Sequence, residues 1–439
     1  MTITAATDRP SDDRSPNERS SDDRSTVERP SNDRRRTEPS NDRGRDEPSG
    51  SGHSAPDRSA VEAALAGLPR VVDLLAARAE EHDRDATFPY QGIEAVHEAG
   101  LLTLTVSERY GGPGGTLADT VRVLAQLGRG DASVAVVTAC TLLQHAEQAR
   151  RASWPTAGYR RLLTESRRGP ALVNTLRAEP GGRPGELPGT VARRDGSGWL
   201  LTGRKTYCTG AEALAWMAVT ARTDEPEPRV GTFLVRGESE GLEIDPTWDQ
   251  LGLRASASHD VVLDRVRVPA ELALGLGTPA RQDDAEVQLA RAWHDLALSA
   301  VAIGVARAAE SWLVRFLNQR TPANLTEPLG TLPRYRCALG EIEAQLIGAE
   351  ELVAGLAPRV DRGEPDAVAR TGPAHLLATR AATAAVQQAV ALTGNPGLSR
   401  RHPLERYLRD VLSSRVHLAP DETVLEAAGR AALERGARP

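Results

Sequence analysis

One short stretch of the chain, residues 203–210, gathers side chains that could bind a flat ligand. It reads GRKTYCTG, so the aromatic ring of Tyr207 and the hydroxyl of Thr209 lie between two glycines. The segment before it predicts a strand that ends in this loop, and glycine lets a backbone approach a ligand closely. A turn alone would explain the two glycines. A strand end capped by polar residues is therefore an alternative to a ligand site.

Sequence patterns for several other chemistries are absent. The chain contains no GxxxxGK(S/T), HExxH or GxSxG sequence. The GLGTPA sequence at 275–280 matches GxGxxA, but no βαβ unit or acidic strand end completes a dinucleotide site, so we interpret it as a linker. The histidines lack the helical spacing of paired metal ligands, and we expect no metal site.

Composition narrows the class of protein further. The 439 residues include 54 basic and 60 acidic side chains, for a net charge of -6. This balance disfavours binding to nucleic acid or to an anionic membrane surface. No uninterrupted apolar run approaches the roughly 20 residues that span a bilayer. The cysteines, Cys140, Cys208 and Cys337, lack the spacing of a zinc site or a disulfide framework, which favours a reducing compartment and a cytoplasmic protein.

Four regions follow from the pattern of apolar residues. Residues 1–58 contain no Leu, Phe, Tyr or Trp and predict a disordered tail. Residues 59–168 show helical periodicity, as do residues 281–435. Residues 169–275 hold short β-branched segments between Gly, Pro and Asp clusters, which predicts a β domain. The segments are 171–176, 198–203, 216–222, 230–235 and 260–268.

Several short sequence blocks follow one another along residues 60–435. The blocks are FP at 88–89, EAGL at 98–101, YGGPGG at 110–115, EPGG at 179–182, GRKTYCTG at 203–210, LGLRAS at 251–256, VRVPAEL at 266–272, GNPG at 394–397, PLER at 403–406 and RD at 409–410. Together, by their order and separations as much as by any one of them, they resemble the acyl-CoA dehydrogenase superfamily. The resemblance implies an α+β fold with an N-terminal helical domain, a central β domain and a C-terminal four-helix bundle.

The resemblance implies a flavin held between the sheet and the bundle. By matching position, Tyr207 would lie against the isoalloxazine ring, and the Thr209 hydroxyl would bond near flavin N5. Gly394 and Gly397 belong to the block that is similar to the flavin-binding bundle. Arg320 stands where the dehydrogenases carry a pyrophosphate-binding arginine, but the Phe-Gly that usually follows is missing. FAD and FMN therefore both remain open.

The superfamily's dehydrogenases need a carboxylate base, and its usual places are changed in this sequence. Counting from the RD block places it at Leu418, and counting back from Gly304 places it at His294. Asp295 and Glu422 lie close enough in sequence to be a displaced base. His417 opens an HLAP sequence that resembles the desulfurisation-type flavin monooxygenases, in which a histidine supports a flavin C4a-hydroperoxide. His417 and His294 are thus the candidate catalytic residues.

The sequence favours a flavin-dependent oxidoreductase, and within that class a monooxygenase that acts on a small molecule with flavin reduced by a separate reductase. The alternative is an acyl-CoA or acyl-carrier dehydrogenase with a relocated base. A second alternative is a non-catalytic scaffold of the same fold. The family resemblance also implies a homo-oligomer, for which we expect a homotetramer first and a dimer as the alternative.

Overall fold

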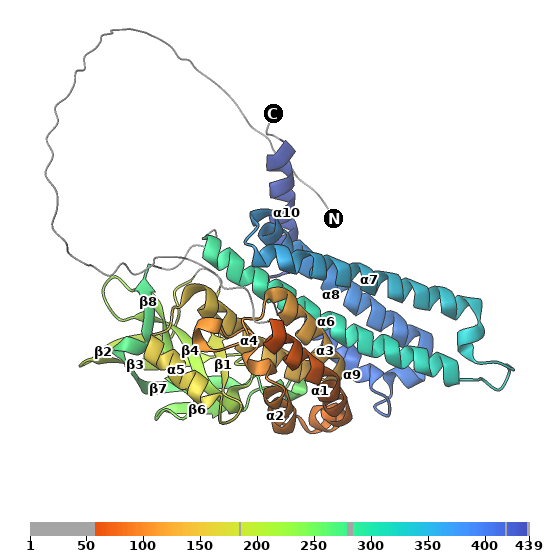
Figure 1. Cartoon of the computed structure of the whole chain (residues 1–439), viewed down its shortest axis with the longest axis horizontal. Coiled ribbons are helices and arrows are strands. Elements are labelled where there is room, and N and C mark those ends of the chain that lie inside the picture. Colours follow the sequence, from red (N-terminus) through yellow and green to blue (C-terminus); the bar gives the residue numbers. More distant parts are fainter. Residues whose placement is uncertain (1–57, 184–185, 279–283, 418, 437–439) are drawn as a thin grey trace, which may run out of the picture. The chain divides into compact units, whose positions relative to one another are not determined.

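Helices, then a sheet, then helices follow one another along the chain. The computed structural model describes residues 58–183, 186–278, 284–417 and 419–436. Figure 1 shows the N-terminal helices, the strands and the C-terminal helices as three successive groups. This order confirms the α+β fold class. The expected disordered tail at 1–58 lies outside the described residues, apart from Arg58, which begins the first helix.

The N-terminal helices bury the apolar stripe that the sequence predicts. Val61, Leu65, Leu68 and Leu75 are buried on α1. Asp131 begins α4, since its carboxylate accepts hydrogen bonds from the backbone N–H groups of Ser133 and Val134. The helices are α1 (Arg58–Asp85), α2 (Tyr90–Glu98), α3 (Leu117–Gly130), α4 (Ala132–Arg151) and α5 (Thr156–Glu165), with short 3₁₀ turns η1 (Leu101–Thr103) and η2 (Glu108–Tyr110).

All five segments predicted as strands form strands of one eight-stranded sheet. Its order is β6-β7-β3-β2-β4-β5-β8, and β1 pairs with β4 in parallel. Antiparallel pairing dominates elsewhere, as in β3 with β7 and β4 with β5. The strands are β1 (Leu172–Leu176), β2 (Val191–Asp195), β3 (Gly198–Lys205), β4 (Leu214–Thr223), β5 (Val230–Arg236), β6 (Leu242–Asp245), β7 (Asp260–Pro269) and β8 (Ala273–Gly277).

The interpretation of 275–280 as a linker is wrong in part. Residues 275–277 belong to β8, which pairs with β5 at the edge of the sheet. Gly275 has a φ of 58°, a left-handed conformation that glycine adopts without strain. Glycines weaken a strand pattern because they bury no side chain, and here edge pairing provides the missing support. Residues 279–283 lie outside the described part of the chain.

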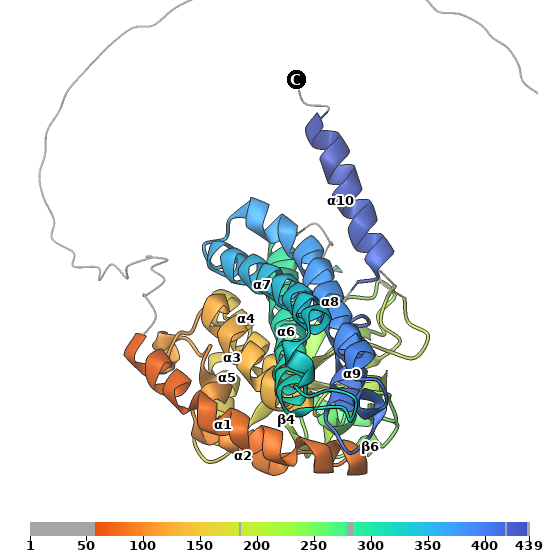
Figure 2. The same cartoon turned by 90° about the vertical axis from the view of Figure 1, so that its right-hand side faces the viewer.

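The C-terminal helices pack around α6, which is the core helix of the bundle. Figure 2 looks along this group and shows α6 among α3, α7, α8 and α9. By length and composition alone α6 is apolar enough to cross a membrane, but 72% of that window is buried inside the protein. It is therefore a core helix. The bounds are α6 (Ala285–Gln319), α7 (Pro333–Asp361), α8 (Pro365–Thr393), α9 (Leu404–Ser413) and α10 (Asp421–Gly436).

Two glycines let α3 and α6 approach closely. A Cβ added at Gly128 on α3 would lie 2.7 Å from the Val301 carbonyl oxygen on α6, and one added at Gly304 on α6 would collide with the Ala125 carbonyl oxygen. The helix backbones therefore touch where a larger residue would force them apart. This contact fixes the position of α6, which carries His294 ten residues before Gly304.

The RD block ties the sheet loops to the helices. The Asp410 carboxylate on α9 accepts a hydrogen bond of 2.8 Å from the Leu253 backbone N–H. Its neighbour Arg409 pairs with Asp83 on α1 at 2.6 Å and donates to the Leu251 carbonyl at 3.0 Å. One short helix thus holds the loop at 251–256 against α1, which explains why these two sequence blocks occur together.

Candidate functional site

A cavity of about 210 Å³ lies between the sheet and the helices. It opens where β1 and β3 end, and α4 and α6 close it from the helical side. Two of the predicted site residues, Tyr207 and His294, share this cavity although 87 residues separate them in sequence. The lining residues are Cys140, Leu143, Gln144, Asn174, Thr175, Leu176, Arg177, Ala178, Thr206, Tyr207 and His294.

The loops beside the cavity hold residues in a strained backbone conformation. Tyr207, Leu253 and Ala257 have φ values of 56°, 52° and 42°, in the left-handed region that residues with a Cβ seldom adopt. Hydrogen bonds hold the loops in place, including a 2.9 Å bond from the Gly210 N–H to the Ser256 carbonyl. Strain of this kind persists where the surrounding structure enforces it, and it concentrates at functional sites.

Tyr207 presents an exposed ring beside the cavity. Its side chain is 66% exposed, although it is a large aromatic residue. The Tyr207 and Trp248 rings form a T-shaped pair with their centroids 6.5 Å apart. An aromatic face left open to solvent has room for a flat ring to pack against it. This placement fits the role that the sequence gives Tyr207.

A chain of hydroxyls ends at Thr209. The Ser258 hydroxyl donates to Thr209 Oγ1 at 3.0 Å, and Ser256 and Ser258 are joined at 2.8 Å. Since Ser258 donates, Thr209 keeps its own hydroxyl hydrogen for another acceptor. Asn174, which lines the cavity, donates to the Thr209 carbonyl at 3.1 Å. The structure thus offers a hydroxyl donor next to Tyr207.

His294 is a neutral histidine at the cavity wall. Burial, followed by the positive charges of Arg177 and Arg150, lowers its pKa from 6.5 to about 4. Neutral imidazole carries one N–H donor and one acceptor nitrogen, so His294 can exchange hydrogen bonds with a ligand near neutral pH. It stands at one of the two places where a dehydrogenase would carry its carboxylate.

Asp295, the neighbour of His294, belongs to a different cluster. Thr371 on α8 donates its hydroxyl to the Asp295 carboxylate at 2.8 Å. The Asp295 carbonyl accepts from the Ser299 hydroxyl at 2.6 Å, and it lies 3.1 Å from His375 Nδ1. Burial raises the pKa of Asp295 to about 6. Its carboxylate therefore bonds to α8 and is not part of the cavity lining.

His417 lies near His375 and not among the described residues that line the cavity. Burial, followed by the charge of His375, lowers its pKa to about 4. The structure therefore does not bring His417 together with Tyr207 and His294. Leu418 lies outside the described residues, and Glu422 is exposed on α10. Neither proposed displaced base, Asp295 or Glu422, reaches the cavity in this chain.

The residues predicted to hold the distal part of a cofactor, Arg320, Gly394 and Gly397, are not among the described residues that line the cavity. Arg320 caps the C-terminal end of α6, 26 residues after His294, so about 39 Å of helix separates the two residues. Gly394 caps α8 with a φ of 64°, and Gly397 packs against Val390 and Thr393. Arg320 and Tyr207 are therefore not one site within a single chain.

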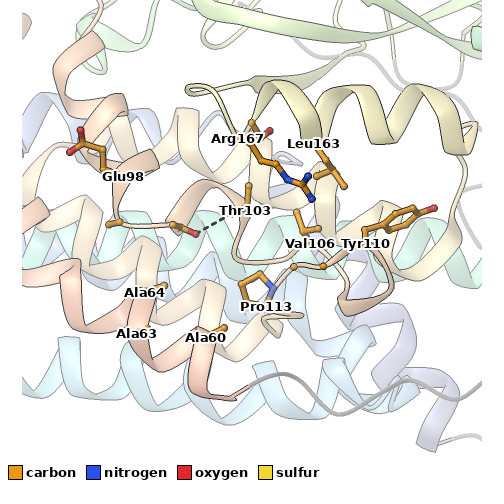
Figure 3. Close-up of a pocket in the computed structure, with 15 residues that line it drawn as sticks. Ala60, Ala63, Ala64, Glu98, Thr103, Val106, Tyr110, Pro113, Leu163 and Arg167 are labelled. Carbon is orange, nitrogen blue, oxygen red and sulfur yellow. Dashed lines mark hydrogen bonds between the residues drawn. The ribbon is translucent and has the colours of Figure 1, made fainter.

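A second cavity, of about 510 Å³, lies among the N-terminal helices. Figure 3 shows Ala60, Ala63 and Ala64 of α1 on one side and Arg167 and Leu163 on the other. Its lining also includes Tyr110, Gly111, Gly112 and Pro113 of the YGGPGG block. None of the predicted site residues lines it.

Three family models match the chain in order. They are "Acyl-CoA dehydrogenase, N-terminal domain" at 71–154, "Acyl-CoA dehydrogenase, middle domain" at 178–266 and "Acyl-CoA dehydrogenase, C-terminal domain" at 296–422. The chain therefore belongs to the acyl-CoA dehydrogenase family, and the resemblance seen in the sequence is confirmed.

The relatives of the chain carry out more than one chemistry. The amino sugar nitrososynthase RubN8 of Streptomyces rubradiris is 31% identical over 375 residues, covering 81% of this chain and 85% of the relative. YdbM of Bacillus subtilis (strain 168), named as an acyl-CoA dehydrogenase, is 29% identical over 371 residues, covering 84% and 96%.

A solved structure of KijD3 in complex with dTDP matches with a TM-score of 0.76 and 26% identity, covering 87% of this chain and 98% of that one. Another KijD3 structure, with a TM-score of 0.73 and 26% identity, holds FMN and a dTDP-linked amino sugar and covers 86% of this chain and 94% of that one.

Several cavity residues were not predicted from the sequence. Gln144, Asn174 and Arg177 line the cavity, and Ser258 bonds to Thr209. Asn174 and Arg177 lie within or just after β1, and Gln144 lies on α4, where nothing in their spacing marks them. The missing information was a contact between distant segments, because the Thr206 N–H donates to the Ala178 carbonyl at 2.9 Å and holds the chain after β1 beside the 203–210 loop.

Proposed function

We propose that the protein is a flavin-dependent monooxygenase that acts on a small molecule. One observation carries the proposal: the cavity beside Tyr207 presents the neutral imidazole of His294 and no carboxylate among its described lining residues. A dehydrogenase of this family removes an α-proton with a carboxylate. A monooxygenase has no need of that base.

The described residues fit a flavin. The exposed ring of Tyr207 offers a face for the isoalloxazine, and the Thr209 hydroxyl has a hydrogen to donate. The FMN bound to KijD3 supports the same cofactor class here. Arg320, Gly394 and Gly397 would hold the remainder of a flavin bound by a partner subunit, so FAD and FMN both stay possible. The bound flavin supplies electron transfer and, once reduced, reaction with oxygen.

The chain's own residues supply orientation and proton control. His294 can donate or accept a hydrogen bond within the cavity, since its pKa of about 4 keeps it neutral near pH 7. Tyr207 and Thr209 set the position of the ring. His417 lies beside His375 and apart from the described lining of the cavity, so its catalytic role is proposed on the HLAP sequence alone. These roles divide binding, orientation and proton transfer among residues from the sheet and the bundle.

A dehydrogenase with a relocated base is the second candidate. Burial raises the pKa of Asp295 to about 6, which is close to the range of a general base. YdbM, whose name is that of an acyl-CoA dehydrogenase, also supports it. Against it, the Asp295 carboxylate is bonded to Thr371 at 2.8 Å and is buried away from the cavity.

The assembly and location belong to the same proposal. Leu425 and Leu433 are 50% and 78% exposed on α10, which contacts the rest of the bundle mainly through α8. Apolar side chains in this setting support a homo-oligomer, and we propose a tetramer. All three cysteines are free, which agrees with a reducing, cytoplasmic compartment.

The proposal is tested by supplying the flavin-loaded protein with a flavin reductase, NADH and oxygen. A panel of small molecules that includes a dTDP-linked amino sugar is screened for products that depend on both oxygen and the reductase. His294→Ala is expected to lower product formation by roughly 10²-fold with flavin binding intact. His417→Ala, measured in the same assay, tests the role proposed from the HLAP sequence. His97→Ala, on α2, is the matched control. Product without oxygen would contradict the proposal, and failure to bind any flavin would favour a non-catalytic scaffold.

A further inference from the structure

The cavity carries positive charge that its own lining does not neutralise. Arg177 and His294 are its ionisable basic side chains, and the described lining residues include neither Asp nor Glu. The charge of Arg177 reaches His294, because it is the largest charge effect that lowers the pKa of that histidine. A ligand that fills the cavity therefore meets a guanidinium close to the imidazole.

The nearest acidic residue in sequence is already engaged elsewhere. Glu179 follows Arg177 by two residues, but its carboxylate accepts from Lys205, from the Gly189 N–H and from Thr190. The Lys205 side chain is fully buried in this pair. Glu179 thus neutralises Lys205, and a carboxylate that serves a buried lysine is not free to serve Arg177.

The remaining polar groups of the cavity fix its shape. Gln144 donates to Thr175 at 2.6 Å, and Asn174 donates to the Thr209 carbonyl at 3.1 Å. Arg177 itself is exposed at the cavity rim. A guanidinium held there can bind a carboxylate or a phosphate through two parallel hydrogen bonds.

We propose that Arg177 binds an anionic group of the ligand in this cavity, a carboxylate or a phosphate. The inference rests on the proposed function, since it describes the ligand of the same site. Two sources share this chemistry: the substrate and the phosphate of the flavin. The cavity volume of about 210 Å³ is below the roughly 300–1,000 Å³ of whole small-molecule sites. It therefore holds one part of a larger ligand.

The test compares the natural protein with Arg177→Gln, Arg177→Lys and Arg160→Gln. Arg160 is exposed on α5, so its variant removes the same charge away from the cavity. In the substrate arm, benzoate and the neutral benzamide are titrated by calorimetry into the protein. In the flavin arm, FMN and riboflavin are titrated and flavin fluorescence is followed.

If Arg177 binds an anionic group of the substrate, benzoate should bind about 10-fold or more tightly than benzamide, as expected for a charged hydrogen bond. Arg177→Gln then removes this preference, Arg177→Lys keeps part of it, and Arg160→Gln keeps all of it. If Arg177 instead binds the phosphate of the flavin, Arg177→Gln should weaken the binding of FMN by about 10-fold and leave the binding of riboflavin unchanged. Either result supports the inference and identifies the source.

The inference is overturned if Arg177→Gln leaves both the benzoate preference and the FMN preference unchanged, or if the natural protein shows neither. Failure of the proposed function gives a different result, because product would then form without oxygen or an acyl-CoA would bleach the bound flavin, whether or not Arg177 binds an anion. The calorimetric arm does not need flavin and would still decide the role of Arg177.

Discussion

The close contact between α3 and α6 predicts opposite effects for two glycine-to-alanine changes. Gly128 on α3 is buried, and an added Cβ would lie 2.7 Å from the Val301 oxygen and 3.3 Å from its Cα. Gly348 on α7 is exposed, and nothing lies within 4 Å of an added Cβ. Alanine therefore gains the same helix propensity at both positions, but only position 348 has room for the added Cβ.

The magnitudes follow from these two terms. Replacing glycine by alanine in a helix stabilises it by roughly 0.5–1 kcal/mol, so we expect that gain for Gly348→Ala. At Gly128 the backbone of α6 must move by several tenths of an ångström, and overpacking of this kind costs about 1–3 kcal/mol. The net of the two effects should therefore lower the free energy of unfolding of Gly128→Ala by up to about 2.5 kcal/mol.

Chemical denaturation of the two variants and the natural protein measures the difference. The midpoint should decrease for Gly128→Ala and increase for Gly348→Ala, with unchanged slopes. Equal stabilisation by both changes would refute the close approach of α3 to α6. Contacts other than this one would then have to fix the position of α6 and of His294, which α6 carries.

Further outcomes are expected from charge, sequence and assembly. His145 and His375 are 1% and 7% exposed, and burial lowers the pKa of each to about 4. Because the unfolded chain takes up protons at a higher pH than the folded protein, the free energy of unfolding should decrease from pH 6.5 toward pH 4 by roughly 3 kcal/mol per histidine. A series of unfolding experiments at different pH values measures this decrease, and a flat profile would contradict it. Removing residues 1–57 should leave the melting temperature and the flavin affinity nearly unchanged, whereas a decrease of several degrees would show that the tail stabilises the fold. Light scattering at micromolar concentration should give the mass of a tetramer, and a monomeric mass would argue against the proposed assembly.

The sequence predicted the parts of the site that lie in local patterns. The position of Tyr207 and Thr209 at a strand end could be predicted because the strand and its loop are contiguous. His294 could be predicted because the alternative base position that the family resemblance implies, counted back from Gly304 on the same helix, falls at this residue. In both cases one element carries the whole signal, and the structure places Tyr207 and His294 at the same cavity.

Other features depend on contacts between distant segments. Arg177 and Gln144 are ordinary polar residues until β1 pairs with β4 and α4 covers the end of the sheet. Strand β2, with two arginines among five residues, has no apolar alternation to mark it, and pairing with β3 supplies its support. His375 bonds to Ser299 at 2.9 Å, 76 residues away, which no spacing rule could have indicated.

Anaerobic mixing of the flavin-loaded protein with a panel of acyl-CoA thioesters tests the central claim most directly. The visible absorbance of the oxidised flavin is followed after mixing. Because no carboxylate base lines the described cavity beside Tyr207 and His294, we expect no acyl-CoA to bleach the flavin. Rapid bleaching by any of them would contradict the monooxygenase assignment, and Asp295→Asn and Glu422→Gln would then locate the base of a dehydrogenase.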